Sequence, residues 1–380
     1  MVYLSCSYIP HEIPLTAGMH VKRGIFEGPL PAMEGYLPRD FCPYARAFLR
    51  QYGDDHVVVI AESCDAMRRV YDALRYWSLA GAVHFVDVPR THDAEAVSFY
   101  AEELRNFASN LMDSNAPLPA DFCENLKSAI GCMNRIRIGL AKVFDLLSER
   151  QVSAVTATRL AMSINQLVAD FSTSQDCADL EPRQPRSKHV FAPSIIETIV
   201  RKAEELIDKT LSEAHPLHPI GNRIPVGVTG TCLLDLSLLH CIESAGLDVV
   251  FIDSCLPSRT YAFTVDNEST SDPFYALAKA YLRKPPCPRM FRDDERIHYL
   301  HGLTSDCDAR GLIYFAPKFC DQAYYDFLEV KHGLKSPGRL PVLLLEGQYG
   351  VGRTGQALTR IAAFREMLES RQIVRAGTSQ

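Results

Sequence analysis

The sequence predicts an α/β protein with two doubly wound parallel-sheet lobes of the flavodoxin or Rossmann-like kind and a helical insert. Two observations predict this fold class. Near the N-terminus, apolar runs at Val57–Ala61 and Val83–Pro89 enclose a helical stripe at Ala66–Trp77, which is a strand–helix–strand unit. After Arg223, strands and helices alternate again. Such units pair their strands in parallel, with right-handed crossovers.

A helical region is expected between the two lobes. Ala94–Met112, Ala120–Arg150 and Ala154–Ser172 carry apolar stripes with a period near 3.6. Asp179–Ser194 is polar and rich in proline, which predicts an exposed linker, and a helix resumes at Ile195–Leu211. The expected domains are an N-terminal α/β lobe at residues 1–92, a helical region at 93–215 with a polar linker near 179–194, and a C-terminal α/β lobe at 216–380.

The C-terminal lobe is expected to carry four strands. Gly230–Ala245 is predicted to turn into the helix after the first of them, and Gln356–Glu369 is predicted to be the terminal helix. In sheets of this kind, ligands bind beyond the carboxyl ends of the strands. The predicted strands are Ile224–Thr229, Val249–Asp253, Gly311–Phe315 and Pro341–Leu345.

Composition excludes several classes of protein. The chain has 380 residues, 47% hydrophobic and 23% charged, which is typical of globular proteins. A net charge of −6 excludes a broad basic surface for nucleic acid. The longest apolar runs are far shorter than the roughly 20 residues of a membrane span. Met1–Ser7 has no basic stretch before an apolar one, so we expect no export and a cytoplasmic location.

Twelve cysteines are the unusual feature of the composition. A reducing cytosol disfavours disulfides, and no CxxC pair of a structural zinc site occurs. Four cysteines follow predicted strands, and two stand beside prolines that stiffen their loops. We expect these six to point into one cleft: Cys6, Cys42, Cys64, Cys255, Cys287 and Cys320. The others are interpreted as structural, with Cys232 and Cys241 on the first helix of the second lobe: Cys123, Cys132, Cys177, Cys232, Cys241 and Cys307.

The six loop cysteines and the segments around them resemble the 2-hydroxyacyl-CoA dehydratase D-component family. The resemblance runs nearly end to end, and the order and spacing of its segments make it specific. The matching segments are Ile9–Gly18, Leu37–Pro43, Glu62–Asp65, Val249–Arg259, Lys318–Asp321 and Gly355–Leu368.

This resemblance implies an iron–sulfur protein with a cofactor between the lobes. In the family, three cysteines per subunit hold one 4Fe–4S cluster, and those positions match Cys42, Cys64 and Cys320. The remaining three are similar to a set in the double-cubane-cluster branch, whose two cubanes are bridged by a sulfide. The branch implies a homodimer that reduces a small substrate under anaerobic conditions. Its low-potential electrons come from a separate ATPase with its own 4Fe–4S cluster, and this chain has no GxxxxGK[ST] phosphate loop.

Other residues near the matched segments are candidates for supporting roles. His11 and Glu12 lie near Cys6 in the sequence, in the matched segment Ile9–Gly18, and either could donate the proton that a reduction requires. Arg259 and Lys318 stand beside proposed ligands and could offset their negative charge. Gly350–Gly355 spells GxGxxG, but too little chain follows for a dinucleotide-binding unit, so we reject that function; the N-terminus of the helix that follows could still bind an anionic substrate group.

Two alternatives to the double-cubane reductase stay open. The first is a lyase subunit, a 2-hydroxyacyl-CoA dehydratase component with a single 4Fe–4S cluster that works as a heterodimer. The second is no enzyme but an iron–sulfur electron-transfer or scaffold protein. Iron content separates the double-cubane reductase from the dehydratase subunit, since two cubanes need about eight irons per chain and one needs about four.

Overall fold

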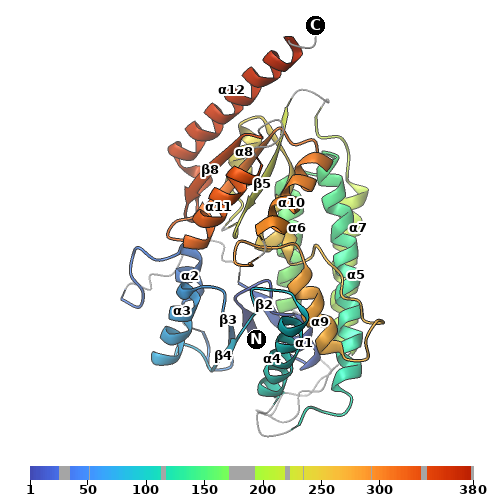
Figure 1. The fold of residues 1–380 in the computed structure, drawn as a ribbon. Helices are drawn as coiled ribbons and strands as arrows, with labels where there is room; N and C mark the ends of the chain where they lie inside the picture. Colours follow the sequence, from blue (N-terminus) through green and yellow to red (C-terminus); the bar gives the residue numbers. More distant parts are fainter. Residues whose placement is uncertain are drawn as a thin grey trace.

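The protein consists of two parallel α/β lobes and a helical region that packs against both (Figure 1). A computed structural model describes residues 1–24, 35–50, 52–112, 117–170, 193–218, 223–233, 235–291, 293–334 and 340–377. The predicted fold class is confirmed. Cys177 and most of the predicted linker, residues 179–192, lie outside the described residues. Among the helices described, none has the length and apolar character needed to cross a membrane.

The first lobe is a four-stranded parallel sheet in the order β2-β1-β3-β4. β1 lies between β2 and β3, with Val2 opposite Val21 on one side and Val57 on the other. Side chains alternate between the two faces, so Val2 and Leu4 enter one hydrophobic core while Tyr3 enters another. The elements of this lobe are β1 (Val2–Leu4), α1 (Glu12–Thr16), β2 (Val21–Arg23), α2 (Pro43–Phe48), β3 (Val57–Ala61), α3 (Asp65–Tyr76) and β4 (Ala82–Val86).

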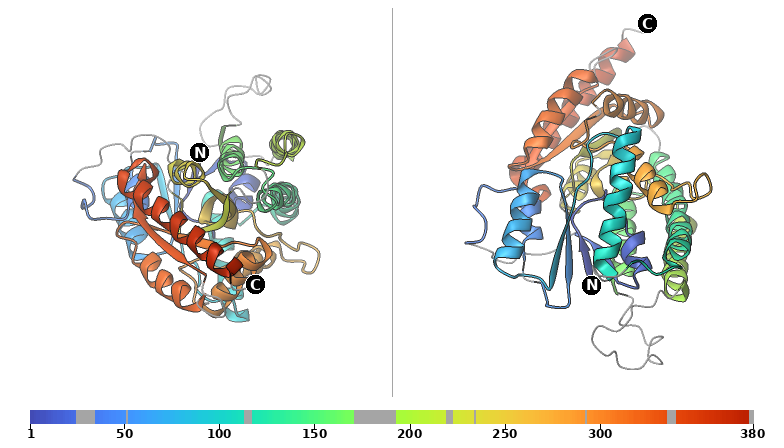
Figure 2. Two further views of the ribbon diagram at one scale, coloured as in Figure 1. Left: turned by 90° about the horizontal axis from the view of Figure 1, so that it is seen from above. Right: turned by 60° about the horizontal axis from the view of Figure 1, so that its bottom comes forward.

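Four long helices form the region that stands between the two lobes in the chain. α5 and α7 run side by side, in contact along their length (Figures 1 and 2). α6 contacts both β2 of the first sheet and the turn that follows β6 of the second. The largest hydrophobic core therefore extends from the first lobe through the helices into the second. The helices are α4 (Ala94–Met112), α5 (Phe122–Ser148), α6 (Ala154–Asp170) and α7 (Pro193–Ser212).

The second lobe repeats the parallel architecture in the order β6-β5-β7-β8. Its last helix, α12, extends away from the body of the molecule at the top of Figure 1. The elements are β5 (Ile224–Gly230), α8 (Ser237–Ser244), β6 (Leu247–Asp253), a turn of π-helix (Cys255–Arg259), α9 (Pro273–Arg283), α10 (Asp293–Asp306), β7 (Gly311–Pro317), α11 (Asp321–Gly333), β8 (Val342–Gly347), a short 3-10 helix (Val351–Arg353) and α12 (Gly355–Gly377).

The segment after β5 differs from the prediction. A helix was expected over Gly230–Ala245, but α8 begins only at Ser237. The carbonyl of Thr231 accepts a hydrogen bond of 3.0 Å from the N–H of Cys255, which keeps the chain beside the neighbouring strand. The carboxylate of Asp235 then accepts from the N–H of Ser237 and initiates the helix. Cys232 therefore lies in a loop, not on the helix where the sequence analysis expected it.

Candidate functional site

A pocket between the lobes collects the loops that follow the strands of both sheets. It has a volume of about 110 Å³, and its wall includes Ser5 and Ser63 from the first lobe and Thr231 and Gln322 from the second. All six cysteines expected to share a cleft line it, together with a seventh that was expected to be structural. The seven are Cys6, Cys42, Cys64, Cys232, Cys255, Cys287 and Cys320.

Three of these cysteines stand at helix N-termini. Cys42, Cys64 and Cys320 each immediately precede the first residue of a helix, α2, α3 and α11 respectively. The N–H of Met67 in the first turn of α3 and that of Ala323 in the first turn of α11 lie near the thiols of Cys64 and Cys320 and lower their pKa values. Such N–H groups favour negative charge on sulfur.

Burial works against ionisation of the same thiols. The Cys42 thiol lies beside Cys320, and this contact, followed by burial, raises the pKa of Cys320 far above its usual value. Burial likewise raises the pKa of Cys64, with the neighbouring Cys320 adding to the effect. In the absence of a compensating cation, the sulfurs of Cys64 and Cys320 are therefore held as neutral thiols.

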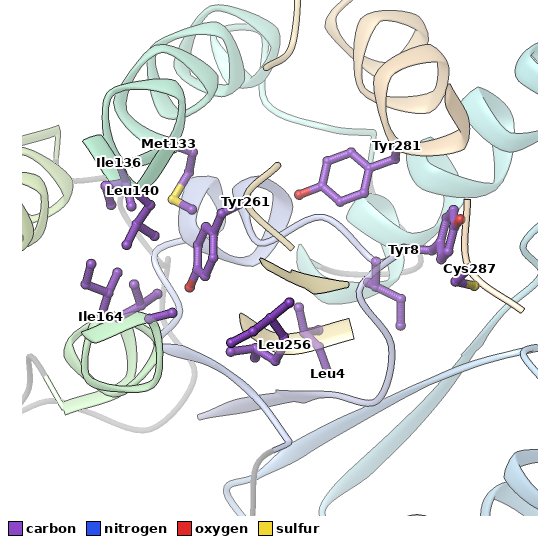
Figure 3. Close-up of a cluster of buried hydrophobic side chains, with 14 of the residues drawn as sticks. Leu4, Tyr8, Met133, Ile136, Leu140, Ile164, Leu256, Tyr261, Tyr281 and Cys287 are labelled. Carbon is purple, nitrogen blue, oxygen red and sulfur yellow. The ribbon is translucent and has the colours of Figure 1, made fainter. Parts of the chain in front are cut away.

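Cys255, Cys287 and Cys6 form a second group. The pKa of Cys255 is raised to about 12: burial is the main cause, Arg259 opposes it, and Cys287 and Cys6 add to it. Nη1 of Arg259 lies 4.0 Å from Sγ of Cys255. Cys287 also lies beside the buried ring of Tyr8, which Figure 3 shows at the edge of the large hydrophobic core.

Cys232 lies between the two groups. It follows β5, which lies between β6 and β7 in the sheet. Cys255 follows β6, and Cys320 follows β7. Burial raises the pKa of Cys232 well above its usual value, and Cys255 and Cys320 raise it further. The position after a strand was the signal used for the other cysteines, and it was missed here because a helix was expected to start at Gly230.

Arg259, one of the two proposed cations, lies near Cys255 but is not among the residues that line the pocket. Its Nε and Nη2 donate to the two carboxylate oxygens of Asp253 at 2.6 and 2.7 Å. Arg296 donates to the same carboxylate at 3.1 Å, and all three side chains are buried. Burial alone would raise the pKa of Asp253, but the two guanidinium groups lower it to about 2. Lys318, the other proposed cation, is exposed and does not line the pocket.

His11 and Glu12 lie behind the pocket wall. Neither lines the pocket, and both are almost completely buried. Glu12 accepts hydrogen bonds of 2.6 Å from Arg137 and 2.7 Å from the hydroxyl of Tyr281. Burial lowers the pKa of His11 well below its usual value, and the nearby Arg23 adds to this. His11 contacts Arg23, a residue of the pocket wall, whose Nη2 lies 3.2 Å from its Nδ1; the role of proton donor stays a prediction for both His11 and Glu12.

The cysteines interpreted as structural, apart from Cys232, do not line this pocket where the structure describes them. Cys123 and Cys132 lie on α5, Cys241 is buried on α8, and Cys307 follows α10. Within the described part of the chain, no three His, Cys, Asp or Glu side chains gather closely enough to hold one metal ion. A cubane does not require that geometry, because each thiolate binds a different iron.

The GxGxxG segment has a packing role. Gly350 adopts a φ of 76°, in the left-handed region that favours glycine, and its N–H donates to the carboxylate of Asp235. A Cβ on Gly352 would lie 1.9 Å from the carbonyl oxygen of Ser237, so only glycine fits against the start of α8. These contacts fix the loop after β8 onto α8.

The fold and the site define the class of protein: a two-lobed α/β protein whose inter-lobe pocket is lined by free cysteines from both sheets. Comparison with known sequences gives the family. The sequence model of 2-hydroxyglutaryl-CoA dehydratase, D-component, matches residues 6–181 and 187–368, and the chain belongs to this family.

Two curated relatives carry dehydratase names. The chain is 23% identical over 380 aligned residues to YjiM of Escherichia coli (strain K12), whose name describes it as a candidate dehydratase subunit. That alignment covers 96% of this chain and 90% of the relative. Over 167 residues, the chain is 27% identical to the (R)-phenyllactyl-CoA dehydratase beta subunit of Clostridium sporogenes, covering 44% of this chain and 43% of the relative.

Proposed function

We propose that the protein is an iron–sulfur component that accepts low-potential electrons and reduces a small substrate at a double-cubane cluster. One observation carries the proposal: seven cysteines from two separate sheets line a single inter-lobe pocket. Family membership adds that the chain acts as one component of a larger system. We propose that the partner is an ATP-hydrolysing activator with its own 4Fe–4S cluster, and that this chain forms a homodimer.

The donor set fits iron–sulfur chemistry. Among the described residues, the pocket wall contains no Asp, Glu or His side chain; its polar side chains are thiols, a few hydroxyls, two arginines and one amide. Thiolates are the ligands that iron–sulfur clusters require, whereas carboxylates suit magnesium or calcium. Burial opposes ionisation of these thiols, and a bound metal reverses that preference because a coordinating thiol is deprotonated.

Six of the thiols fall into two groups of three, according to which thiols act on one another electrostatically. Cys320 interacts with Cys42 and Cys64, and the first-lobe cysteines of this group stand at helix starts. Cys255 interacts with Cys287 and Cys6. Three thiolates for each of two cubanes is the stoichiometry that the double-cubane branch implies. We therefore assign Cys42, Cys64 and Cys320 to one cubane and the other three to the second.

The chain's own residues supply the setting for one-electron chemistry, which the cluster provides when bound. The N-termini of α3 and α11 stabilise negative charge on Cys64 and Cys320, and Arg259 does so for Cys255. Burial and few hydrogen bonds to sulfur lower the potential of such a cofactor. A low potential explains why the electron donor would need energy from ATP.

A single-cluster dehydratase subunit is the second candidate function. The names of both relatives favour it, since each describes a dehydratase subunit. In this case Cys42, Cys64 and Cys320 would hold one 4Fe–4S cluster, and the second group of thiols would hold no iron.

Iron and sulfide analysis of anaerobically purified protein tests both candidates. About eight irons per chain are expected for two cubanes and about four for one. Electron paramagnetic resonance after reduction shows whether the iron belongs to a reducible cluster. A colourless protein without iron would overturn both proposals.

A further inference from the structure

Two buried arginines without carboxylate partners line the thiol pocket, and a buried lysine lies close to them. Arg23 and Arg289 line the pocket and are 2% and 6% exposed, and Lys284, 2% exposed, lies beside them. Among the described residues, no acidic side chain forms an ion pair with any of the three. Elsewhere this fold pairs its buried cations, as Asp253 does for Arg259. Unpaired buried charge is costly, so this part of the pocket favours an anion.

Arg23, one of the residues that line the pocket, has hydrogen-bond donors without a partner in the described structure. Its Nη2 donates to the carbonyl of Ile9 at 2.8 Å and lies 3.2 Å from Nδ1 of His11. Its Nε and Nη1 are buried and have no hydrogen-bond partner within the described structure. A guanidinium carries five N–H donors, so three of them remain available.

The position of Arg23 is fixed by its backbone. Asn165 on α6 accepts a hydrogen bond of 3.1 Å from the N–H of Arg23 and donates one of 3.0 Å to its carbonyl. Arg23 also forms the last residue of β2, in register with Leu4 of β1. The backbone of Arg23 is therefore held beside α6, and because its side chain is only 2% exposed, bulk solvent does not satisfy these donors.

Arg289 approaches the pocket from the second lobe. Its Nη2 donates to the carbonyls of Val88 at 2.6 Å and Glu62 at 3.1 Å, which are neutral acceptors. Its Nε is buried and has no partner among the residues described. The positive charge of Arg289 is thus hydrogen-bonded without being neutralised.

Lys284 and Arg289 both lie close to the ring of Tyr8, and Lys284 also contacts Ser7 of the pocket wall. Nζ of Lys284 donates to Oγ of Ser7 at 3.0 Å and lies 4.0 Å from the centre of the Tyr8 ring. Cζ of Arg289 lies 5.3 Å from the same ring. Figure 3 shows the ring next to Cys287, one of the pocket cysteines.

We propose that Arg23 and Arg289 bind a compact oxyanion, the carboxylate or inorganic oxyanion group of a small substrate, in the pocket wall beside Cys6. The inference rests on the proposed function, because it names the charged group of that site's substrate. Buried guanidinium donors bind such oxygens with short, charge-assisted hydrogen bonds.

The cofactor's own negative charge is the competing explanation for these cations. Other groups already face its ligands: Arg259 lies near Cys255, and the first turns of α3 and α11 face Cys64 and Cys320. The unpartnered groups of Arg23 are N–H donors. Oxygen accepts hydrogen bonds from such donors more strongly than sulfur does, so they fit an oxyanion better than the sulfur ligands of the cofactor.

The test is a calorimetric titration of the full-length, anaerobically purified protein with sodium acetate and, separately, with sodium sulfate, with iron measured on the same sample. We expect saturable binding of at least one anion, and the two arms distinguish a carboxylate from an inorganic oxyanion. Arg23→Gln and Arg289→Gln should each weaken binding at least about tenfold. Arg310→Gln is the matched control, because Arg310 pairs with Asp308 at an exposed site.

Three results would overturn the inference: no saturable binding by the unmodified protein, unchanged affinity in both variants, or loss of iron in Arg23→Gln in parallel with loss of the anion. The last would assign the charge to the cofactor. Thermal unfolding checks that each variant folds, and if neither does, the titration of the unmodified protein still decides. A sample that binds the anion but contains no iron would support the anion site while refuting the proposed function.

Discussion

The side-chain amide of Gln322 donates a hydrogen bond of 2.8 Å to the backbone carbonyl of Ser63, and so joins the two lobes at the pocket. Gln322 follows Cys320 by two residues, and Ser63 precedes Cys64. The bond therefore couples two loops that carry cysteines of the same proposed cubane. Because the partners come from different sheets, the bond fixes the separation of those cysteines.

Gln322→Ala tests this coupling. We expect a loss of about 1 kcal/mol in the free energy of unfolding, the usual contribution of one hydrogen bond, and faster release of iron to a chelator. Gln151→Ala is the control, since the side chain of Gln151 donates a hydrogen bond to the exposed Glu149, outside the pocket. Equal rates of iron release in the two variants would mean that the bond does not hold the site together.

Replacing individual cysteines tests the division between ligands and structural residues. Cys42→Ala and Cys320→Ala should each remove the iron of one cubane, about four irons per chain, because each withdraws one of three thiolates. Cys123→Ala should leave the iron content unchanged, since Cys123 is exposed on α5. Iron analysis after anaerobic purification gives the answer. Equal loss from all three variants would contradict the division.

The sequence was sufficient to predict most strands of the two sheets and most of the pocket cysteines. β-branched runs such as Val57–Ala61 mark strands by themselves, and parallel strands bring their carboxyl ends to one edge. The three-residue strand Val21–Arg23 was missed, because so short a run shows no periodicity. Helices α1, α2, α9, α10 and α11 were not predicted either.

The cations of the pocket could not be predicted. Arg23 stands on the missed strand, and Lys284 and Arg289 flank a proline-rich loop with no recognisable pattern. Their proximity arises from contacts over long stretches of chain, such as that between Lys284 and Ser7. Nothing in the local sequence encodes such a contact. The burial of Glu12 against Arg137 is of the same kind.

Cys232 offers a separate test of the pocket wall. Because it lies between the two groups of thiols, its S–H can hydrogen-bond to neighbouring thiolates, and such bonds raise the potential of a cluster. We expect Cys232→Ala to keep its iron but to show a lower reduction potential in a redox titration followed by electron paramagnetic resonance. Cys241→Ala, a buried cysteine on α8, is the control and should leave the potential unchanged. Iron loss as large as in Cys42→Ala would instead make Cys232 a ligand.

Glu12 and Arg137 form a buried ion pair at 2.6 Å, with both side chains at most 1% exposed. Glu12→Gln leaves the guanidinium unpaired, and we expect a loss of roughly 3–5 kcal/mol in the free energy of unfolding, measured with urea. Asp308→Asn, which breaks an exposed pair with Arg310, should cost less than about 1 kcal/mol. A Glu12→Gln protein with normal stability and iron content but no substrate reduction would instead support the predicted role in proton donation.

Lys284 makes stability depend on pH. Burial lowers the pKa of its ammonium group from 10.5 to about 7, with Arg23 adding to the effect and Cys6 opposing it. Between these two values the unfolded chain binds more protons than the folded one, so stability must rise with pH.

We expect the iron-free protein to gain about 2 kcal/mol in the free energy of unfolding from pH 7 to pH 9 through this group. Lys284→Met should lack that gain, since methionine fills a similar volume without a charge. Urea unfolding of both proteins at the two pH values measures the difference, and the remaining titrating groups cancel between them. Equal pH dependence in the two proteins would show that the ammonium group keeps its charge in the fold, held by Ser7 and the Tyr8 ring.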